Sequence, residues 1–328
     1  MPIPSGPVRW GILGCGDVTE VKSGPGFQRA EGSALAAVMR RDRVKAEEYA
    51  RRHHVPRAYG DAAALIDDPD VDAVYVATPP DSHESLAVRV AAAGKPCLVE
   101  KPMARSYAEC QRMIEAFSRA GVPLWVAYYR RALPRFLTLR ELVQSGAIGP
   151  VTSVHVQVTD RLARGEAAAN WRFDPAQAGA GLFLDLASHC VDILDFLFGP
   201  ITDACGYPLN TGGAYPAEDV TTAAFRFGDR LSGTGTWNFN APAKTDVLTL
   251  TGSGGTITSP IFSDTDLVVA PAVGDPQALP VRNPPHVHQP LIQSIVDELR
   301  GRGRCESTAE SGARASWVMD RCLGRAAR

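Results

Sequence analysis

The chain has 328 residues, of which 45% are hydrophobic and 21% charged, a composition typical of a globular protein large enough for two domains. Its 34 lysines and arginines nearly balance 36 aspartates and glutamates, giving a net charge of −2. This balance argues against nucleic acid or an anionic membrane as partner.

Seven scattered cysteines without a Cys-x-x-Cys pair argue against a disulfide framework and a zinc site, so we expect no metal. Residues 1–8 lack a signal-peptide pattern, and no apolar run approaches the ~20 residues of a membrane span. We therefore expect a cytoplasmic protein.

A glycine-rich turn follows the first apolar run, residues 8–13. We interpret this run as a buried strand. Gly14 and Gly16 allow the tight turn and close backbone approach that a pyrophosphate needs, and the amides of the next helix, starting at Asp17 and Val18, would face that anion. Thr19 stands where the dinucleotide fingerprint has its third glycine. Taken alone, the turn fits an ordinary strand-to-helix connection equally well.

A second apolar run, residues 35–39, ends at Arg40 and Arg41. An NAD site places an acidic side chain here for the ribose 2′-hydroxyl, whereas arginine accommodates a 2′-phosphate. The pair therefore favours NADP over NAD. The alternative is that both arginines are solvated residues opening the next helix, residues 44–53.

Strands and helices continue to alternate up to residue 128, which predicts a parallel, doubly wound sheet. The strand over residues 72–77 ends at Thr78 and Pro79, at the sheet edge where such folds bind ligands. The helix over residues 83–93 would be capped by Ser82 or Asp81. His83, at its start, is a candidate cofactor contact, although a purely structural role fits as well.

The fifth predicted strand, residues 95–99, delivers Glu100, Lys101 and Pro102. Pro102 disfavours helical geometry at the preceding residue, so the lysine is held extended at the strand end. Lys101 is the residue we expect to carry the chemistry. A helix over residues 106–120 and a sixth strand, 124–128, complete the first domain, which we place at residues 1–126.

The pattern changes after a helix that ends near residue 145. Valines alternate with polar residues over residues 154–158, as in a sheet with one buried face. Further strands are predicted at residues 222–227, 231–239, 247–251 and 267–270, giving a mostly antiparallel sheet. The second domain would span residues 127–328. Two C-terminal helices, over residues 289–300 and 309–322, are expected to pack against the first domain.

An apolar helix predicted between Gly181 and Gly199 carries Asp185, His189 and Asp192 at positions i, i+4 and i+7, on one face. An imidazole oriented by a carboxylate is suited to general acid–base catalysis. A structural histidine satisfied by aspartate is the alternative. Trp171 and Arg172, which precede this helix, could line a substrate pocket.

With these residues in place, the chain resembles the Gfo/Idh/MocA family of nicotinamide-dependent oxidoreductases. The resemblance rests on motifs in a fixed order, namely Gly14-Cys15-Gly16, Arg41-Asp42, Thr78-Pro79, Glu100-Lys101-Pro102 and Asp185-x-x-x-His189. It implies an α/β protein, with an N-terminal Rossmann doubly wound parallel sheet and a C-terminal α/β domain whose open antiparallel sheet commonly forms a homodimer or homotetramer interface.

The resemblance also implies site roles. Lys101 would act near the nicotinamide and the substrate hydroxyl, Asp185 would hold substrate, and His189 would be the acid–base. Many relatives have asparagine where this chain has Tyr129. The predicted substrate contact of Tyr129 is therefore not implied by the family resemblance. The expected reaction is hydride transfer between NADP and a hydroxyl or carbonyl carbon of a sugar, cyclic polyol or related small molecule. Two alternatives stay open, a redox-neutral enzyme with tightly bound NAD, as in NAD-dependent glycosidases, and a non-catalytic cofactor sensor.

Overall fold

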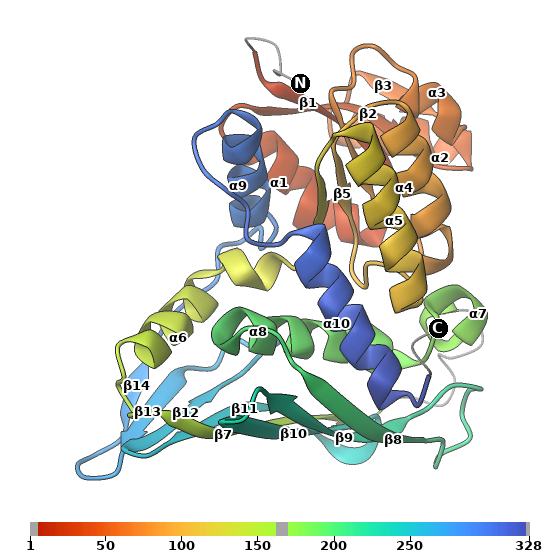
Figure 1. The fold of residues 1–328 in the computed structure, drawn as a ribbon. Helices are drawn as coiled ribbons and strands as arrows, with labels where there is room; N and C mark the ends of the chain where they lie inside the picture. Colours follow the sequence, from red (N-terminus) through yellow and green to blue (C-terminus); the bar gives the residue numbers. More distant parts are fainter. Residues whose placement is uncertain (1–5, 162–169, 326–328) are drawn as a thin grey trace. The chain divides into compact units, whose positions relative to one another are not determined.

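The protein is described by a computed structural model that covers residues 6–161 and 170–325. Two compact units divide the chain (Figure 1). The first unit comprises Met1–Ala104, Ala108–Leu133 and Pro284–Ala313, and the second comprises Arg105–Tyr107, Pro134–Asn283 and Arg314–Arg328. Each unit is therefore assembled from segments that are separated in the sequence.

The first unit is built on a parallel six-stranded sheet with the order β3-β2-β1-β4-β5-β6. Its strands are β1 (Val8–Leu13), β2 (Ser33–Met39), β3 (Arg57–Tyr59), β4 (Ala73–Val76), β5 (Cys97–Val99) and β6 (Leu124–Val126). Every residue of β4, β5 and β6 is buried, as expected for a parallel sheet covered on both faces. The strand order reverses between β1 and β4, and ligands of doubly wound sheets bind at such a switch point.

Helices complete the first unit. They are α1 (Gly24–Arg29), α2 (Arg43–Arg52), α3 (Ala62–Ile66), α4 (His83–Ala92), α5 (Tyr107–Ala120) and α9 (Gln289–Leu299). Helix α9 comes from the C-terminal segment and lies beside α1 (Figure 1), where a Cβ added at Gly26 would meet Ile292 at 2.9 Å. The same segment reaches β6, because Val126 N donates to Ser307 O at 3.2 Å and Ser307 Oγ donates to Val126 O at 2.6 Å.

The second unit is built on an eight-stranded sheet with the order β14-β13-β12-β11-β7-β10-β9-β8. Its strands are β7 (Val151–Arg161), β8 (Asp203–Leu209), β9 (Val220–Phe227), β10 (Leu231–Asn238), β11 (Asn240–Gly252), β12 (Gly255–Ser259), β13 (Leu267–Pro271) and β14 (Gln277–Leu279). Strands β7 and β10 pair in parallel, and the other pairs among these strands are antiparallel.

One face of this sheet is covered by helix. The covered face carries Val154, Val156 and Val158 of β7, which are at most 5% exposed. Ring contacts tie the helical layer to it, with centroids 5.1 Å apart for Phe183 and Trp237. Figure 1 shows α8 (Ser188–Phe198) lying along the sheet. The unit also contains α6 (Pro134–Gln144) and the short α7 (Pro175–Ala178), and α10 (Ala309–Cys322) begins in the first unit and ends in the second.

The helix predicted between Gly181 and Gly199 is in fact two joined segments. A π-helix over Phe183–Ala187 precedes α8, so Asp185 and His189 lie on different helix types. Strands β8, β12 and β14 were not predicted. Each is short or carries glycine or proline, which weakens the alternating apolar signal of a half-buried strand.

No helix within the described parts of the chain is both long and apolar enough to cross a membrane. The same residues contain no group of three or more His, Cys, Asp or Glu side chains arranged to hold a metal ion.

Candidate active site

The glycine turn closes tightly on the switch point of the first sheet. Gly14 has φ +94°, and a Cβ there would lie 2.8 Å from Thr78 Cγ2 and 3.0 Å from the Ala77 backbone. Any side chain at Gly14 would therefore clash and strain the backbone. At Gly16 the nearest heavy atom to an added Cβ is Gly14 O, at 4.0 Å. The turn is thus packed on one side and open at Gly16, which fits the close approach of a dinucleotide pyrophosphate.

Thr19, in place of a third glycine, is fully buried and takes part in packing. Its hydroxyl donates to Gly16 O at 2.7 Å, and its carbonyl accepts from the Tyr49 hydroxyl at 2.9 Å. Thr19 begins a π-helix that runs to Ser23 and leads into α1. Asp17 is exposed and Val18 half-buried at the entrance to this segment.

The two arginines after β2 are both exposed. Arg40 Nη1 donates to Cys15 O at 3.4 Å, which places its guanidinium at the glycine turn. Asp42 caps α2, since its carboxylate accepts from Lys45 N at 3.3 Å. The Asp42 carboxylate at this sheet edge is therefore engaged in capping α2, and the neighbouring Arg40 and Arg41 are positively charged.

His83 connects the ends of two strands. Its Nε2 lies 2.7 Å from Thr78 O, and its Nδ1 lies 3.2 Å from both Pro102 O and Met103 O. The ring is fully buried, and this burial lowers the pKa of His83 although the carbonyls favour the charged form. The side chain therefore holds the segment after β5 against the turn after β4.

Ser82 is the N-cap residue of α4, as predicted, but its side chain makes no cap hydrogen bond. Its hydroxyl donates instead to Thr78 Oγ1 at 2.7 Å, so Ser82 braces the turn that contains Pro79.

Glu100 is turned into the first unit and anchors the residue after it. Its carboxylate accepts hydrogen bonds from the Tyr75 hydroxyl and, at 3.0 Å, from Lys101 N. Glu100 N donates to Val76 O at 2.8 Å. The Lys101–Pro102 peptide bond is cis, and Lys101 is half-buried. The backbone of Lys101 is thus fixed at the carboxyl end of β5 by a buried carboxylate.

A further candidate residue, His288, lies in the C-terminal segment. It is 1% exposed, its ring stacks on Tyr129 with centroids 4.3 Å apart, and its Nδ1 lies 3.9 Å from Glu100 Oε1. Burial, reinforced by the cations of Lys22, Arg130 and Lys101, lowers the pKa of His288 to about 3. The ring is therefore neutral at pH 7. Sequence reasoning missed it because a lone histidine in a proline-rich segment gives no local signal.

The second unit contributes its own group of predicted residues. Arg172 Nε lies 3.4 Å from Asp185 Oδ2, and its guanidinium lies over the Trp171 ring at 4.5 Å. His189 is 3% exposed and meets the Phe262 ring edge-on, with centroids 6.0 Å apart. The structure thus brings Asp185, Arg172 and Trp171 together. Asp185 lies in the π-helical segment, a form often found at functional sites.

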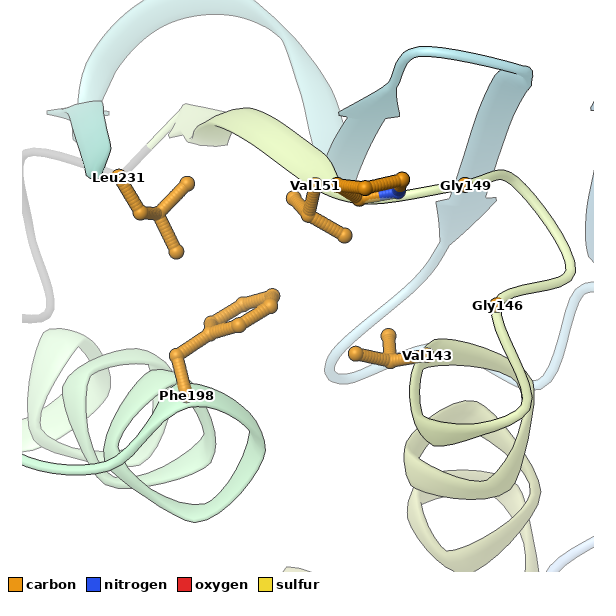
Figure 2. A pocket seen from close by; sticks show the side chains of 7 residues that line it. Val143, Gly146, Gly149, Val151, Phe198 and Leu231 are labelled. Atoms are coloured by element: carbon orange, nitrogen blue, oxygen red, sulfur yellow. The ribbon is translucent and has the colours of Figure 1, made fainter.

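An apolar cavity of about 540 Å³ lies at the other end of α8 (Figure 2). Phe198 and Leu231 point into it, and its lining contains no titratable side chain: Val143, Gly146, Gly149, Pro150, Val151, Phe198 and Leu231. At 1.5 Å per helical residue, Phe198 is roughly 13 Å along α8 from His189. The chemistry of the predicted residues is therefore not in this cavity.

Comparison with known families decides the assignment. Residues 8–128 match a model described as an oxidoreductase family with an NAD-binding Rossmann fold, and residues 136–258 match the GFO/IDH/MocA C-terminal domain. A curated relative, Oxidoreductase P35 of Formosa agariphila, is 36% identical over 95% of this chain and 97% of its own. The chain belongs to the Gfo/Idh/MocA family. It is accordingly an NAD(P)-dependent dehydrogenase or reductase, as its motifs predicted.

Other members of the Gfo/Idh/MocA family extend this comparison. Trans-1,2-dihydrobenzene-1,2-diol dehydrogenase of Bos taurus is 30% identical over 80% of this chain and 77% of its own. The WlbA dehydrogenase of Bordetella pertussis, solved in complex with NADH and UDP-GlcNAcA, superposes with a TM-score of 0.87 at 24% identity, covering 98% of this chain and 96% of its own. This structural likeness confirms the two-sheet α/β fold.

Proposed function

We propose that this enzyme transfers a hydride between NADP and a carbon bearing a hydroxyl or carbonyl on a small ring compound, a sugar, cyclic polyol or cyclic diol. Residues 1–126 would bind the cofactor, and residues 127–328 would bind substrate. The observation that carries the proposal is the anchored Lys101, a cationic side chain whose backbone is fixed by buried Glu100 at the ligand-binding edge of a dinucleotide-binding sheet.

The substrate class is supported by what the relatives act on or bind. The Bos taurus enzyme is named for a cyclic vicinal diol, and the Bordetella pertussis structure contains a nucleotide-linked sugar acid. Both present hydroxyl groups on a six-membered ring. The paired Asp185 and Arg172 offer the acceptor and donors that adjacent ring hydroxyls require.

Each residue then has a chemical task. Bound NADP would supply the hydride acceptor or donor at its nicotinamide. His189 would take the proton from the substrate hydroxyl during oxidation and return it during reduction. Lys101 would stabilise the negative charge that develops on that oxygen. Asp185 would hold a second hydroxyl, with Tyr129, Trp171 and Arg172 forming further substrate contacts.

The cofactor would be held by residues of the glycine turn and of the neighbouring strand ends. Gly14, Gly16, Asp17 and Val18 would form the pyrophosphate cradle, with Thr78 and Pro79 at the adjoining strand end. The buried His83 and Glu100, predicted as cofactor contacts, would act by holding the adjoining strand ends in place. Arg40 and Arg41 would receive the 2′-phosphate, because they follow β2 directly while the Asp42 carboxylate beside them is engaged in capping α2. Replacing Arg40 and Arg41 with serine should weaken NADPH binding by roughly 10-fold or more while leaving NADH binding unchanged. Equal losses for both nucleotides would contradict the phosphate role.

The reaction itself is tested by assaying sugars, inositols and cyclic diols with both nucleotides. We expect Lys101→Met to reduce kcat at least 10²-fold and His189→Gln to do so by a similar factor, while NADPH binding measured by fluorescence stays normal. Lys45→Met, which changes an exposed lysine on α2, is the matched control and should keep full activity. Full turnover by Lys101→Met with bound cofactor would reject the assignment.

We also propose a homodimer or homotetramer formed through the uncovered face of the second sheet. That face is polar, with Ser153, His155 and Gln157 exposed on β7. Replacing Gln157 with a bulky charged residue should then lower the mass measured by light scattering. A cytoplasmic location is supported by the seven cysteines, all within the described residues, which form no disulfide with one another, and cell fractionation tests it.

A further inference from the structure

A tight turn next to His189 is held by one carboxylate. Asp246 accepts three successive backbone hydrogen bonds, from Ile261 N at 2.9 Å, Phe262 N at 2.8 Å and Ser263 N at 2.7 Å. Successive amides that converge on one anion form a nest, and their hydrogen bonds are strengthened by its charge. The backbone conformation of the turn therefore depends on Asp246.

Asp246 occupies an unusual place for a carboxylate. In β11 it lies in the same alternating row as Leu248 and Leu250, which are both fully buried, and it pairs with the buried Val158 of β7. It thus ends an apolar row on the covered face of the second sheet. Placing a carboxylate on a covered sheet face costs several kcal/mol unless it is hydrogen-bonded, and the three amides supply that compensation.

The middle residue of the turn contacts the proposed acid–base. Phe262 meets the imidazole of His189 edge-on, with ring centroids 6.0 Å apart and an interplanar angle of 73°. Such an edge-to-face arrangement is a favoured geometry for aromatic rings. A second clamp holds the chain beyond the turn, since Arg135 donates to Thr265 O at 2.6 Å and to Val281 O at 3.0 Å.

We propose that Asp246 is a positioning residue for His189, which acts by fixing the 261–263 turn so that Phe262 sets the orientation of the imidazole ring. The inference rests on the proposed function of His189 as the acid–base. Asp246 itself touches neither substrate nor cofactor in this scheme. Loss of the carboxylate would leave the imidazole in place but misdirected, and misplacement of a reacting group by about 1 Å can reduce a rate 10²-fold.

The test compares Asp246→Asn, Phe262→Leu and the double variant. Each single change should lower kcat by roughly 10-fold to 10²-fold, with little change in the KM for nucleotide. Because both act through one contact, the double variant should lose no more than the worse single variant. Asp246→Glu, which keeps a carboxylate, should recover part of kcat. Asp264→Asn is the control, since this exposed aspartate of the same segment pairs with Asn283 and should leave kcat unchanged.

The outcomes separate this inference from the proposed function. An inactive His189→Gln together with wild-type kcat in Asp246→Asn or Phe262→Leu overturns the inference alone, as do losses that multiply in the double variant. Full turnover by His189→Gln overturns both. If Asp246→Asn does not fold, Phe262→Leu decides, and an unchanged kcat in that variant rejects the positioning role.

Discussion

Replacing Tyr75 with phenylalanine removes one oxygen atom from the centre of the first unit. Tyr75 is fully buried in β4, and its hydroxyl donates to the Glu100 carboxylate. Burial, together with the charge of Glu100, raises the pKa of Tyr75 well above its ordinary value, so the phenol remains protonated and donates throughout the working pH range. Phenylalanine fills the same space, and the change therefore isolates the hydrogen bond.

The expected cost follows from the charge of the acceptor. A hydrogen bond to an ionised group contributes about 1.5–3 kcal/mol, compared with about 0.5–1.5 kcal/mol for a neutral one. We expect Tyr75→Phe to lower the free energy of unfolding of the first unit by about 2 kcal/mol, which corresponds to roughly 4–8 °C in Tm. Tyr49→Phe is the matched control, because Tyr49 is equally buried but donates to the neutral Thr19 carbonyl. It should cost about 1 kcal/mol.

Urea unfolding followed by tryptophan fluorescence measures both changes, with Trp10 and Trp125 as reporters inside the first unit. Activity is a second readout. Glu100 also holds Lys101 N, so Tyr75→Phe should lower kcat by roughly 10-fold if Lys101 must be held in one geometry. A stability loss for Tyr75→Phe that is no larger than that for Tyr49→Phe would refute the reasoning from the charged acceptor.

Further predictions concern the glycine turn, the buried histidine and the thiols. Gly14→Ala should destabilise the cofactor-free protein by about 1–3 kcal/mol, because Gly14 has a positive φ. Gly16→Ala should leave the Tm unchanged in thermal unfolding, and equal Tm values for the two variants would contradict the prediction. Because the folded pKa of His288 is lowered to about 3 from 6.5, the unfolded state takes up its proton first. Stability should therefore fall as pH drops below 6.5, by up to about 1.4 kcal/mol per pH unit, and His288→Gln should flatten that slope in urea titrations at pH 7 and 5.5. Iodoacetamide should label the native protein at the exposed Cys205. It should label the buried Cys15 slowly, because burial raises the pKa of this thiol to about 11. Fast labelling of Cys15, detected by mass spectrometry, would contradict its burial.

Much of the first unit could be predicted because local signals and tertiary structure agree. The run at residues 8–13 has the bounds that the sequence predicted, since it is a mostly apolar segment ended by glycine. The missed strands β8 and β14 lie at the edges of the second sheet. An edge strand is paired on one side alone and needs little apolar sequence.

The candidate site residues likewise divide into those that a local sequence signal reveals and those that it does not. Gly14, Lys101 and His189 could be found because each belongs to a short motif whose spacing has a physical reason. His288 and Asp246 could not, because their partners are distant in the sequence: Glu100 for the first and residues 261–263 for the second. Contacts of this kind follow from the path of the chain and leave no mark on local periodicity.

The discontinuous make-up of the first unit has a consequence for biosynthesis. Strand β6 obtains part of its hydrogen bonding from Ser307, and Trp125 bridges to Thr308. A ribosome must therefore synthesise the sheet of the second unit before the edge of the first sheet can be covered. Nascent chains that end before residue 307 carry an unpaired edge strand, the kind of surface on which chains aggregate or chaperones act. The unit whose first strand is made earliest is thus completed only after every strand of the second sheet has been synthesised.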